Sequence, residues 1–403
     1  MSTRHLYIHV PFCARRCTYC DFSIAVRSRV PVAGYLDALG REAALAGVAP
    51  APGALAADPA PGAGGVAPSP GVAERAASPG LAHRLAESDT LYLGGGTPSK
   101  LGGEGVARLA ALLGVDPARP PGEFTLEANP EDVSAASAGA WAAAGVNRIS
   151  IGAQSFDDTV LAWMHRTHDA ARIGEAVAAA RRAGIAGVSL DLIFALPEAI
   201  ARDWRRDLDR ALALEPDHVS LYGLTLEPAT PLFRRAARGA PAAAPAADSR
   251  YAEEYLFAHE RLAGEGYAFY EVSNAARPGR EAVHNRAYWR REPYLGLGPS
   301  AHSFDGAARW WNERAYEAWR RKLAAGRSAV AGREILGEPE RRLEAIYLGL
   351  RTSDGVPLPE PCPPALRATL DRWVAAGWAA LSPRRVRLTP AGWLRLDELV
   401  TTF

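Results

Sequence analysis

Two absences narrow the function before any motif is considered. None of the apolar runs in the 403 residues approaches the roughly 18 residues of a membrane-spanning helix, and the first ten residues, MSTRHLYIHV, lack the charged and apolar regions of a signal peptide. The net charge of +1 gives no general reason to expect a polyanionic partner such as nucleic acid. We therefore expect a cytoplasmic protein that is long enough to form one large domain and a smaller one.

Cysteine is scarce as well, and the four cysteines are unevenly placed. Cys13, Cys17 and Cys20 fall within eight residues after an apolar, strand-like stretch, whereas Cys362 lies in the distant turn EPCPP. Soft thiolate sulfur selects an iron–sulfur cluster, zinc or monovalent copper. Structural zinc needs a fourth ligand nearby, and a disulfide would leave an odd thiol. The trio therefore predicts a metal or cluster site, and a cubane held by three sulfurs leaves one iron open to another ligand.

Short β-rich runs alternate with longer helical runs over most of the chain, which is typical of a parallel sheet with crossover helices. Six such units predict a partial α/β barrel, in which the working residues lie at the carboxyl ends of the strands. The expected strands are 5–10, 90–93, 124–127, 148–151, 188–193 and 218–221, and the expected helices include 32–46, 105–113, 171–183 and 204–214.

Two segments interrupt this alternation. Residues 48–81 are dominated by Ala, Pro and Gly and lack periodicity, so they predict a flexible insertion between the first helix and the second strand. Residues 239–248 look like a shorter version of the same kind of loop.

The composition changes after Gly326, and we place a domain boundary there, with a barrel over 1–326 and a smaller domain over 327–403. Helical periodicity over 338–351 places Leu343, Ile346, Tyr347 and Leu350 on one face. A second amphipathic helix over 366–377 and a strand, turn, strand and helix follow, which resembles a winged-helix module.

Winged-helix modules often bind DNA, and Arg384, Arg385 and Arg387 would suit a wing. Affinity for DNA needs a run of phosphate contacts, however, and three arginines in a neutral chain are few. We therefore favour a domain that covers the open side of the barrel, and keep a nucleic-acid-binding regulator as an alternative.

Several polar residues lie where a sheet core would place apolar ones. Gly94, Gly95, Gly96 and Thr97 directly follow a strand, where backbone without side chains can approach a ligand closely. Glu127 and Asp191 lie in or at the end of buried strands, and because an unpaired buried charge is costly, each implies a cationic or hydroxyl partner.

The cysteine spacing Cys-x3-Cys-x2-Cys is the signature of the radical S-adenosylmethionine superfamily. Further motifs resemble the branch that contains the oxygen-independent coproporphyrinogen dehydrogenases and the HemW heme chaperones. They occur in that branch's order between Tyr7 and Phe304, as LYIHVPFC, LGGGTPS, NRISIGAQSF, DLIFALP, HNRAYW and GLGPSAHSF.

The resemblance implies a partial barrel of six βα units that carries a 4Fe-4S cluster on Cys13, Cys17 and Cys20, with S-adenosylmethionine on the open iron. It further implies that a glycine loop contacts the amine of this cofactor, and that one acidic residue lies near its polar end and another near its adenosine. An arginine among further polar groups would bind its carboxylate. Aromatic side chains and a backbone contact to adenine would complete the site. The corresponding residues are Gly95, Gly96 and Thr97 for the loop, Glu127 and Asp191 for the acids, Gln154 and Arg166 for the polar groups, Tyr7 and Tyr19 for the aromatic contacts, and Gly223 for adenine.

Two features favour the chaperone branch. The dehydrogenases have a further cysteine two positions after the third, where this chain has Phe22, and HNRAYW (284–289) is typical of HemW. Imidazole is a usual axial ligand of heme iron, and aromatic rings offer flat apolar area to a porphyrin, so the motif implies heme contacts by His284, Tyr288 and Trp289. The alternative interpretation is a histidine and aromatics that hold a loop against the barrel, and His302 is a second candidate heme ligand.

We therefore expect a heme chaperone that transfers heme to apo-hemoproteins, with respiratory proteins as the expected recipients. The alternative is an enzyme that oxidatively decarboxylates the propionates of coproporphyrinogen III. A cofactor site does not by itself decide between them.

Overall fold

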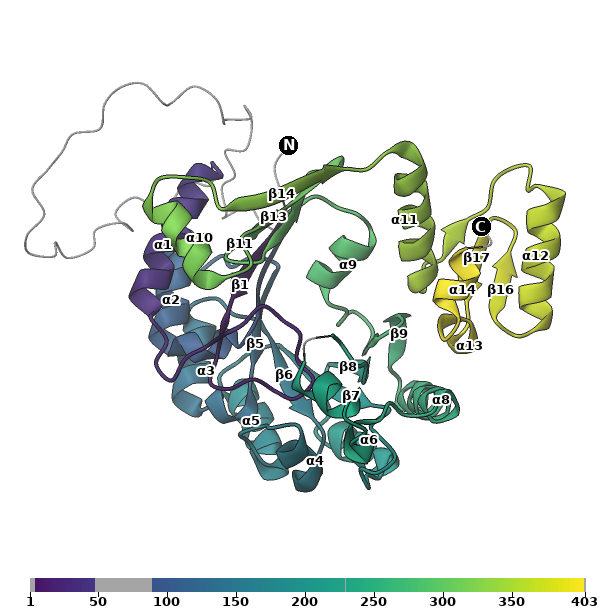
Figure 1. Cartoon of the computed structure of the whole chain (residues 1–403), viewed down its shortest axis with the longest axis horizontal. Coiled ribbons are helices and arrows are strands. Elements are labelled where there is room, and N and C mark those ends of the chain that lie inside the picture. Colours follow the sequence, from purple (N-terminus) through teal and green to yellow (C-terminus); the bar gives the residue numbers. More distant parts are fainter. Residues whose placement is uncertain (1–3, 48–88, 229, 402–403) are drawn as a thin grey trace, which may run out of the picture.

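The computed structural model of the chain describes residues 4–47, 89–228 and 230–401 (Figure 1). The expected insertion at 48–81 lies outside the described residues. A single mixed sheet dominates the structure, with the strand order β14-β13-β12-β11-β1-β4-β5-β6-β7-β8-β10-β9. Among the described helices, none is both long and apolar enough to cross a membrane.

The centre of this sheet is parallel and confirms the predicted partial barrel. The six expected strands are β1 (His5–Val10), β4 (Thr90–Gly95), β5 (Glu123–Ala128), β6 (Arg148–Gln154), β7 (Gly187–Phe194) and β8 (His218–Gly223). The helices that connect or follow them include α1 (Val32–Leu45), α2 (Gly102–Leu112), α3 (Ala135–Ala143), α4 (Asp158–Trp163), α5 (Ala170–Arg182) and α6 (Trp204–Leu212). The sheet curves like a barrel wall but remains open (Figure 1).

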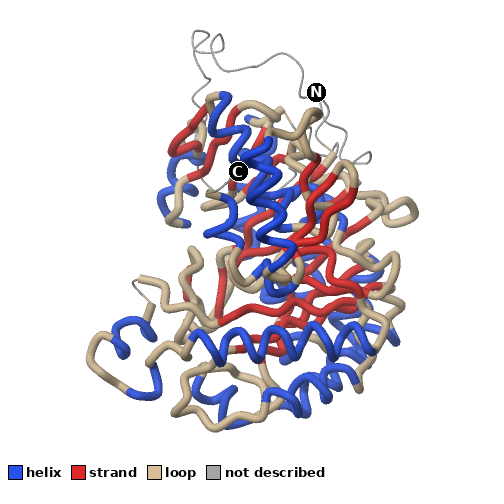
Figure 2. The backbone as a smooth tube through the Cα atoms, turned by 90° about the vertical axis from the view of Figure 1, so that its right-hand side faces the viewer, coloured by secondary structure: helices blue, strands red, loops and turns tan. Residues whose placement is uncertain are grey.

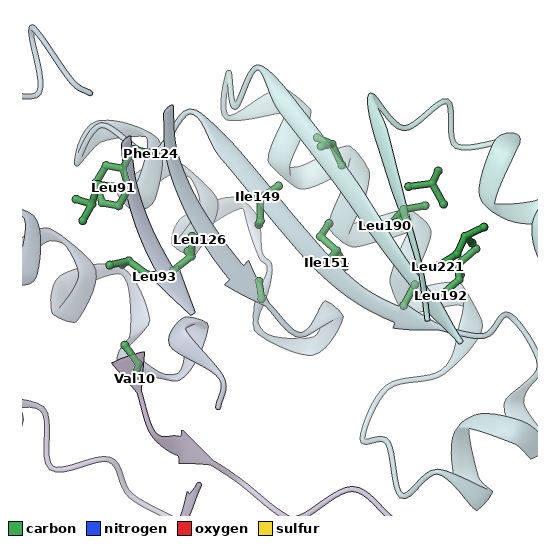
Figure 3. Packing of buried hydrophobic residues seen from close by; sticks show 14 of the residues in the cluster. Val10, Leu91, Leu93, Phe124, Leu126, Ile149, Ile151, Leu190, Leu192 and Leu221 are labelled. Carbon is green, nitrogen blue, oxygen red and sulfur yellow. The ribbon is translucent and has the colours of Figure 1, made fainter. Parts of the chain in front are cut away.

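The two faces of the parallel strands have opposite chemistry. Apolar side chains such as Leu126, Ile149 and Leu190 are fully buried in one extended core and lie in a row across successive strands (Figure 3). Residues that alternate with them, such as Glu127 and Asp191, line a cavity on the other face. Because side chains alternate across a strand, the apolar set packs against the helices and the polar set faces the barrel lumen. Figure 2 shows helices running alongside the strand layer.

Antiparallel strands extend both edges of the parallel sheet. On one side, β11 (Tyr294–Leu297) pairs parallel with β1, and β12 (His302–Phe304), β13 (Ala308–Asn312) and β14 (Val330–Ile335) continue antiparallel. On the other side, β10 (Asn274–Ala276) and β9 (Ala268–Glu271) follow β8. The helices α7 (Pro231–Ala236) and α8 (Asp248–Gly264) lie on the same side as β9 and β10. On the opposite side, α10 (Tyr316–Ala324) contacts α1.

The short helix α9 (Val283–Trp289) lies at the amino-terminal end of β4 and β5, on the inner side of the sheet (Figure 1). The Glu123 carboxylate accepts hydrogen bonds from the backbone N–H groups of Val283 (2.8 Å) and His284 (2.9 Å). A carboxylate at a helix amino terminus satisfies otherwise unpaired donors and complements the helix dipole. This contact fixes the position of the HNRAYW motif inside the barrel.

Residues 338–401 contain the elements expected from the sequence. They are α11 (Glu338–Arg351), β15 (Val356–Pro357), α12 (Pro364–Ala375), β16 (Ala379–Ser382), β17 (Arg385–Leu388), α13 (Pro390–Trp393) and α14 (Leu396–Val400), with a three-stranded sheet in the order β15-β17-β16. The strand β14, at 330–335, still pairs with the barrel sheet, and α11 begins directly after it.

Packing of α11 differs in one respect from the expected face. Ile346 and Leu350 are buried as expected, but Leu343 is 54% exposed.

Two of the arginines proposed for a wing make contacts within the chain. Arg385 donates hydrogen bonds to the carbonyls of Asp354 and Gly355. Arg384 lies 3.3 Å from a carboxylate oxygen of Glu360.

The segment 239–248 is not the loose loop that its composition suggests. It contains a 3-10 turn over Pro241–Ala243, and Ala243 is fully buried. The indole N–H of Trp163 donates to the Ala242 carbonyl at 3.1 Å. This aromatic anchor supplies the contact that the Ala- and Pro-rich sequence lacks.

Candidate cofactor site in the barrel lumen

The cysteine loop lies at the carboxyl end of β1 and is held from two sides. It begins in β2 (Phe12–Cys13), which pairs with β3 (Ala25–Val26). Within the loop, Thr18 donates its N–H to the Met164 carbonyl after α4 (3.3 Å) and accepts from the Leu232 N–H of α7 (2.8 Å). The adjacent Tyr19 packs against the small cluster that contains Met164. These contacts fix the loop over the open end of the barrel.

A cavity of about 400 Å³ lies between this loop and the ends of the parallel strands, and we call it the cofactor cavity. It gathers residues from seven segments of the sequence, which extend from Cys13 to Glu227. Of the residues predicted to bind the cluster or the cofactor, those that line the cavity are Cys13, Cys17, Cys20, Tyr19, Gly95, Gly96, Thr97, Glu127, Gln154, Arg166, Asp191 and Gly223. Tyr7 is not among the lining residues.

The thiols of Cys13 and Cys20 need a positive partner to ionise. Burial raises the pKa of the Cys13 thiol to about 11, although the Thr97 hydroxyl lies 3.2 Å from its sulfur, and burial also raises the pKa of Cys20. Among the described residues, no three His, Cys, Asp or Glu side chains gather closely enough to hold one metal ion. Thiolates that bind different irons of a cubane stand farther apart than those that share one ion. Three sulfur donors that line one cavity fit a cluster that keeps one iron open.

Arg166 lies deep in the cofactor cavity and has donors to spare. One terminal nitrogen donates to the Asn129 side-chain oxygen (2.7 Å) and the Gly152 carbonyl (2.9 Å), and the other lies 3.6 Å from the Cys17 sulfur. Its Nε is buried without a partner among the described residues. Burial would lower the pKa of Arg166, but the neighbouring Tyr19 and Cys17 raise it above its usual value, so the guanidinium stays charged. An arginine with an unpaired donor in a cavity suits a carboxylate ligand.

Two carboxylates lie in the same cavity as this cation. Glu127 accepts hydrogen bonds from the Tyr92 hydroxyl (2.8 Å) and the Gly95 N–H (3.0 Å), and burial raises its pKa to about 7. Asp191 accepts from the Ser150 hydroxyl at 2.9 Å, and burial raises its pKa as well. Because the charge of Asp191 also raises the pKa of Glu127, the cavity favours a ligand that brings positive charge or hydroxyl donors.

The glycine run after β4 is required by close packing within the protein. A Cβ atom on Gly95 would lie 2.6 Å from the His9 imidazole, and one on Gly96 would lie 2.8 Å from the Pro11 backbone. Gly95 also has a φ of 111°, which disfavours other residues. The glycines therefore let β4 approach β1 closely, and this contact brings the Thr97 hydroxyl to the Cys13 sulfur.

Sequence reasoning missed four polar residues that complete the cavity. Asn129 and Ser150 bind Arg166 and Asp191, Tyr92 binds Glu127, and Tyr222 lies in the cavity wall. Ser150 and Tyr222 could have been found from strand alternation, because each occupies the face that carries the predicted acid on a neighbouring strand. Asn129 follows β5 and carried no comparable signal.

The predicted heme contacts lie elsewhere. The His284 imidazole is buried and makes two hydrogen bonds, to the Thr90 hydroxyl (2.7 Å) and the Tyr288 hydroxyl (2.8 Å). Burial lowers its pKa to about 3, so the ring is neutral. Tyr288 and Trp289 line a different cavity, to which Tyr7 also contributes. In this conformation His284 supports Tyr288, and iron coordination would require it to give up one of these hydrogen bonds.

Comparison with known proteins places this geometry in context. The Radical SAM superfamily matches residues 7–211. The heme chaperone HemW of Mycobacterium tuberculosis is 36% identical over 99% of this chain and 94% of its own length. HemW of Bacillus subtilis is 30% identical over 87% of this chain and 84% of its own.

Among solved structures, the fold resembles that of the coproporphyrinogen III oxidase HemN of Escherichia coli, described as a radical SAM enzyme. The TM-score is 0.73 and the likeness covers 100% of this chain and 90% of the other, at 20% sequence identity. This likeness extends to the described carboxyl-terminal elements.

Proposed function

Because this chain belongs to the Radical SAM superfamily, and within it to the family of the HemW heme chaperones, we propose that it binds heme and transfers it to apo-hemoproteins. The observation that carries the proposal is the identity of 36% with a heme chaperone over 99% of the chain. Such coverage includes the barrel, the HNRAYW motif and the carboxyl-terminal elements together. We propose the two-domain division from the sequence as part of this assignment.

We propose that Cys13, Cys17 and Cys20 hold a 4Fe-4S cluster. The raised pKa values of Cys13 and Cys20 support this, because thiols that resist ionisation in the free protein need the charge of iron to become thiolates. Cys362 takes no part, since it lies in the turn before α12.

S-adenosylmethionine is the proposed second ligand of the cofactor cavity. When bound and reduced through the cluster, this cofactor would supply a deoxyadenosyl radical. The residues of the chain bind and orient it: Arg166 would grip its carboxylate, the loop Gly95–Thr97 its amine, and Glu127 and Asp191 its cationic and hydroxyl groups. Gln154, Tyr19 and the backbone at Gly223 would complete the contacts, and Tyr7 would act only indirectly, through its hydrogen bond to His9 at 3.0 Å.

Heme is the proposed cargo, held by the HNRAYW motif. Tyr288 and Trp289 present aromatic surface to a cavity, which supports contact with a flat macrocycle. The recipients would be apo-hemoproteins, among which respiratory proteins are the first to test. We expect no role for nucleic acid, because two of the three wing arginines make contacts within the chain.

A paired assay tests the proposal against its alternative. Purified protein with a reconstituted cluster is loaded with heme and mixed with an apo-hemoprotein, and heme transfer is followed by absorbance. The same preparation is incubated without oxygen with coproporphyrinogen, S-adenosylmethionine and a reductant. We expect heme transfer and no protoporphyrinogen; turnover at an enzymatic rate without heme transfer would establish the dehydrogenase instead.

A further inference from the structure

A second cavity of about 400 Å³ lies beside the cofactor cavity, between the β11–β13 edge of the sheet and α11. This volume is in the range of cofactor sites. Its lining residues come from β1, α9, β11, β12, β13 and α11, and we call it the second cavity. The aromatic and charged residues that the argument uses are Tyr288, Tyr294, His302, Phe304, Arg309 and Glu344.

The walls of the second cavity are aromatic. Tyr288 and Tyr294 meet edge to face at 4.6 Å between ring centroids, and Phe304 lies opposite Tyr294 in the strand register. Trp289 lines the same space. These rings offer a slot for a flat apolar ligand, and on their own they would take any aromatic molecule.

His302 gives this slot the capacity to bind a metal. Its exposed imidazole stacks on Trp311, with 5.9 Å between ring centroids, and neither ring nitrogen has a hydrogen-bond partner among the described residues. Partial desolvation by the cavity walls and the charge of Arg309 lower its pKa, so the ring is neutral at pH 7 and a nitrogen lone pair is available. In these respects it contrasts with His284, which is buried with both nitrogens hydrogen-bonded.

Two arginines in the second cavity favour a ligand with negatively charged groups. Arg291 and Arg309 both line the cavity, and both bind the carboxylate of Glu344 on α11, Arg291 at 2.9 Å. Two guanidinium groups that bind one carboxylate of the protein could bind a carboxylate of a ligand in its place with similar hydrogen bonds. Glu344 is the only cavity group that reaches both arginines among the described residues.

Backbone strain supports a functional role for the second cavity. Six described non-glycine residues have a positive φ, and four of them line the two cavities: Gln154 and His165 in the cofactor cavity, Arg291 and Ser300 in the second. Such conformations are costly and concentrate at functional sites.

We propose that the second cavity is the heme site, with His302 as the axial ligand of iron and Arg291 and Arg309 binding the propionates in place of Glu344. This rests on the proposed function and assigns its site. An iron porphyrin matches all three features together, because it is flat and apolar, accepts a nitrogen ligand, and carries two carboxylates on one edge. Since Glu344 belongs to α11, heme entry would exchange an internal carboxylate for an external one and loosen the contact of α11 with the barrel.

The test is a heme titration of the full chain as wild type, His302→Ala and His284→Ala, with metal-free protoporphyrin IX titrated in parallel. We expect His302→Ala to raise the apparent heme Kd by about tenfold to a hundredfold, the scale on which changes around a metal site act. Metal-free porphyrin should bind the variant and the wild type equally, because it has no iron to coordinate. Added imidazole should restore the wild-type Soret band of the variant.

The arginines are tested with Arg291→Gln and Arg309→Gln against heme and its dimethyl ester. Each variant should weaken heme binding by about tenfold, the usual scale of one lost charged hydrogen bond, and leave the ester unaffected. Arg261→Gln is the control, because Arg261 also binds two carboxylates but lies on α8, outside both cavities.

The outcomes separate this inference from the proposed function. If wild type binds no heme, the proposed function fails and the site with it. If wild type binds heme and His302→Ala matches it in affinity and spectrum, the site assignment is wrong and the proposed function stands. Loss of binding only in His284→Ala, with that variant still folded by circular dichroism, would return the ligand role to His284.

Discussion

The two cavities of the barrel are similar in size and differ in how the sequence encodes them. The cofactor cavity is built from residues that directly follow parallel strands, within motifs that are contiguous in sequence. The second cavity combines β1, a short helix, three edge strands and α11. The motifs HNRAYW and GLGPSAHSF supply aromatic residues and His302 of the second cavity, whereas its charged residues Arg291, Arg309 and Glu344 lie outside any motif.

His9 lies between the two cavities and would separate the two proposed ligands. His9 lines the second cavity, while its ring occupies the space where a Gly95 side chain would be, 2.6 Å from an added Cβ. Its Nε2 donates to the Ser23 carbonyl in the loop that follows the cysteines (3.1 Å). Burial lowers the pKa of His9 to about 4, so its ring carries no charge at neutral pH. The ligands would be close neighbours but held by separate residues.

The largest expected effect is the loss of the cluster from the cofactor cavity while heme binding to the second cavity is retained. Cys13→Ser should abolish the cluster, because two protein sulfurs do not replace three, and should leave heme affinity within about twofold, because no residue lines both cavities. Iron and sulfide analysis and a heme titration on the same sample measure both. Cys362→Ser is the control and should retain the full cluster. Equal loss of cluster and heme in Cys13→Ser would show that the cavities are not independent.

Arg166→Lys should weaken S-adenosylmethionine binding to the reconstituted protein by about tenfold, since a lysine cannot reproduce the two-pronged grip on a carboxylate. Isothermal titration calorimetry measures the affinity. The partly exposed Arg172 on α5 gives a matched control, and Arg172→Lys should bind the cofactor normally. Unchanged affinity in Arg166→Lys would remove this residue from the site.

The raised pKa of Glu127 predicts that cofactor binding depends on pH. With a pKa of about 7, the carboxylate fraction falls from about 0.9 at pH 8 to about 0.1 at pH 6, so affinity for a positively charged ligand should fall as pH falls through 7. Relative to Glu127→Gln, wild type should lose about tenfold in affinity over this range. Parallel pH profiles of the two proteins would contradict the assignment of Glu127.

The smallest effect concerns the contact between α11 and the barrel. Glu344→Gln removes the charge that competes for Arg291 and Arg309, so heme should bind about threefold tighter, which corresponds to the weak net worth of one partly exposed ion pair. S-adenosylmethionine affinity should not change. Glu338→Gln, in the exposed first turn of the same helix, is the control. Weaker heme binding in Glu344→Gln would mean that Glu344 positions the arginines rather than competes with the ligand.

Much of the barrel could be predicted because its strands carry a strong local signal. Their outward residues, such as Leu126 and Ile149, are apolar at every second position, and the six expected strands agree with the structure to within a few residues. The residues expected in the cofactor cavity follow these strands, and parallel strands deliver their carboxyl ends to one edge. Only Tyr7 lies outside that cavity, because it sits in the middle of β1.

The rest depended on contacts that the sequence does not encode locally. Nothing near 239–248 indicates that the distant Trp163 indole holds this segment. The periodicity of α11 placed Leu343 in the core, but this helix packs against α9, α14, β15 and β17 through its other sides and leaves Leu343 exposed. Likewise, the role of His284 could not be read from HNRAYW, because its partner Thr90 is 194 positions away.

The most direct test of the account is a heme titration of full-length protein that already carries its cluster, followed by electron paramagnetic resonance of the reduced sample. We predict one heme per chain with a histidine-ligated spectrum, and a cluster signal that is unchanged by heme. Failure to bind heme, or loss of the cluster signal in step with heme uptake, would contradict the claim that this barrel holds two ligands in two separate cavities.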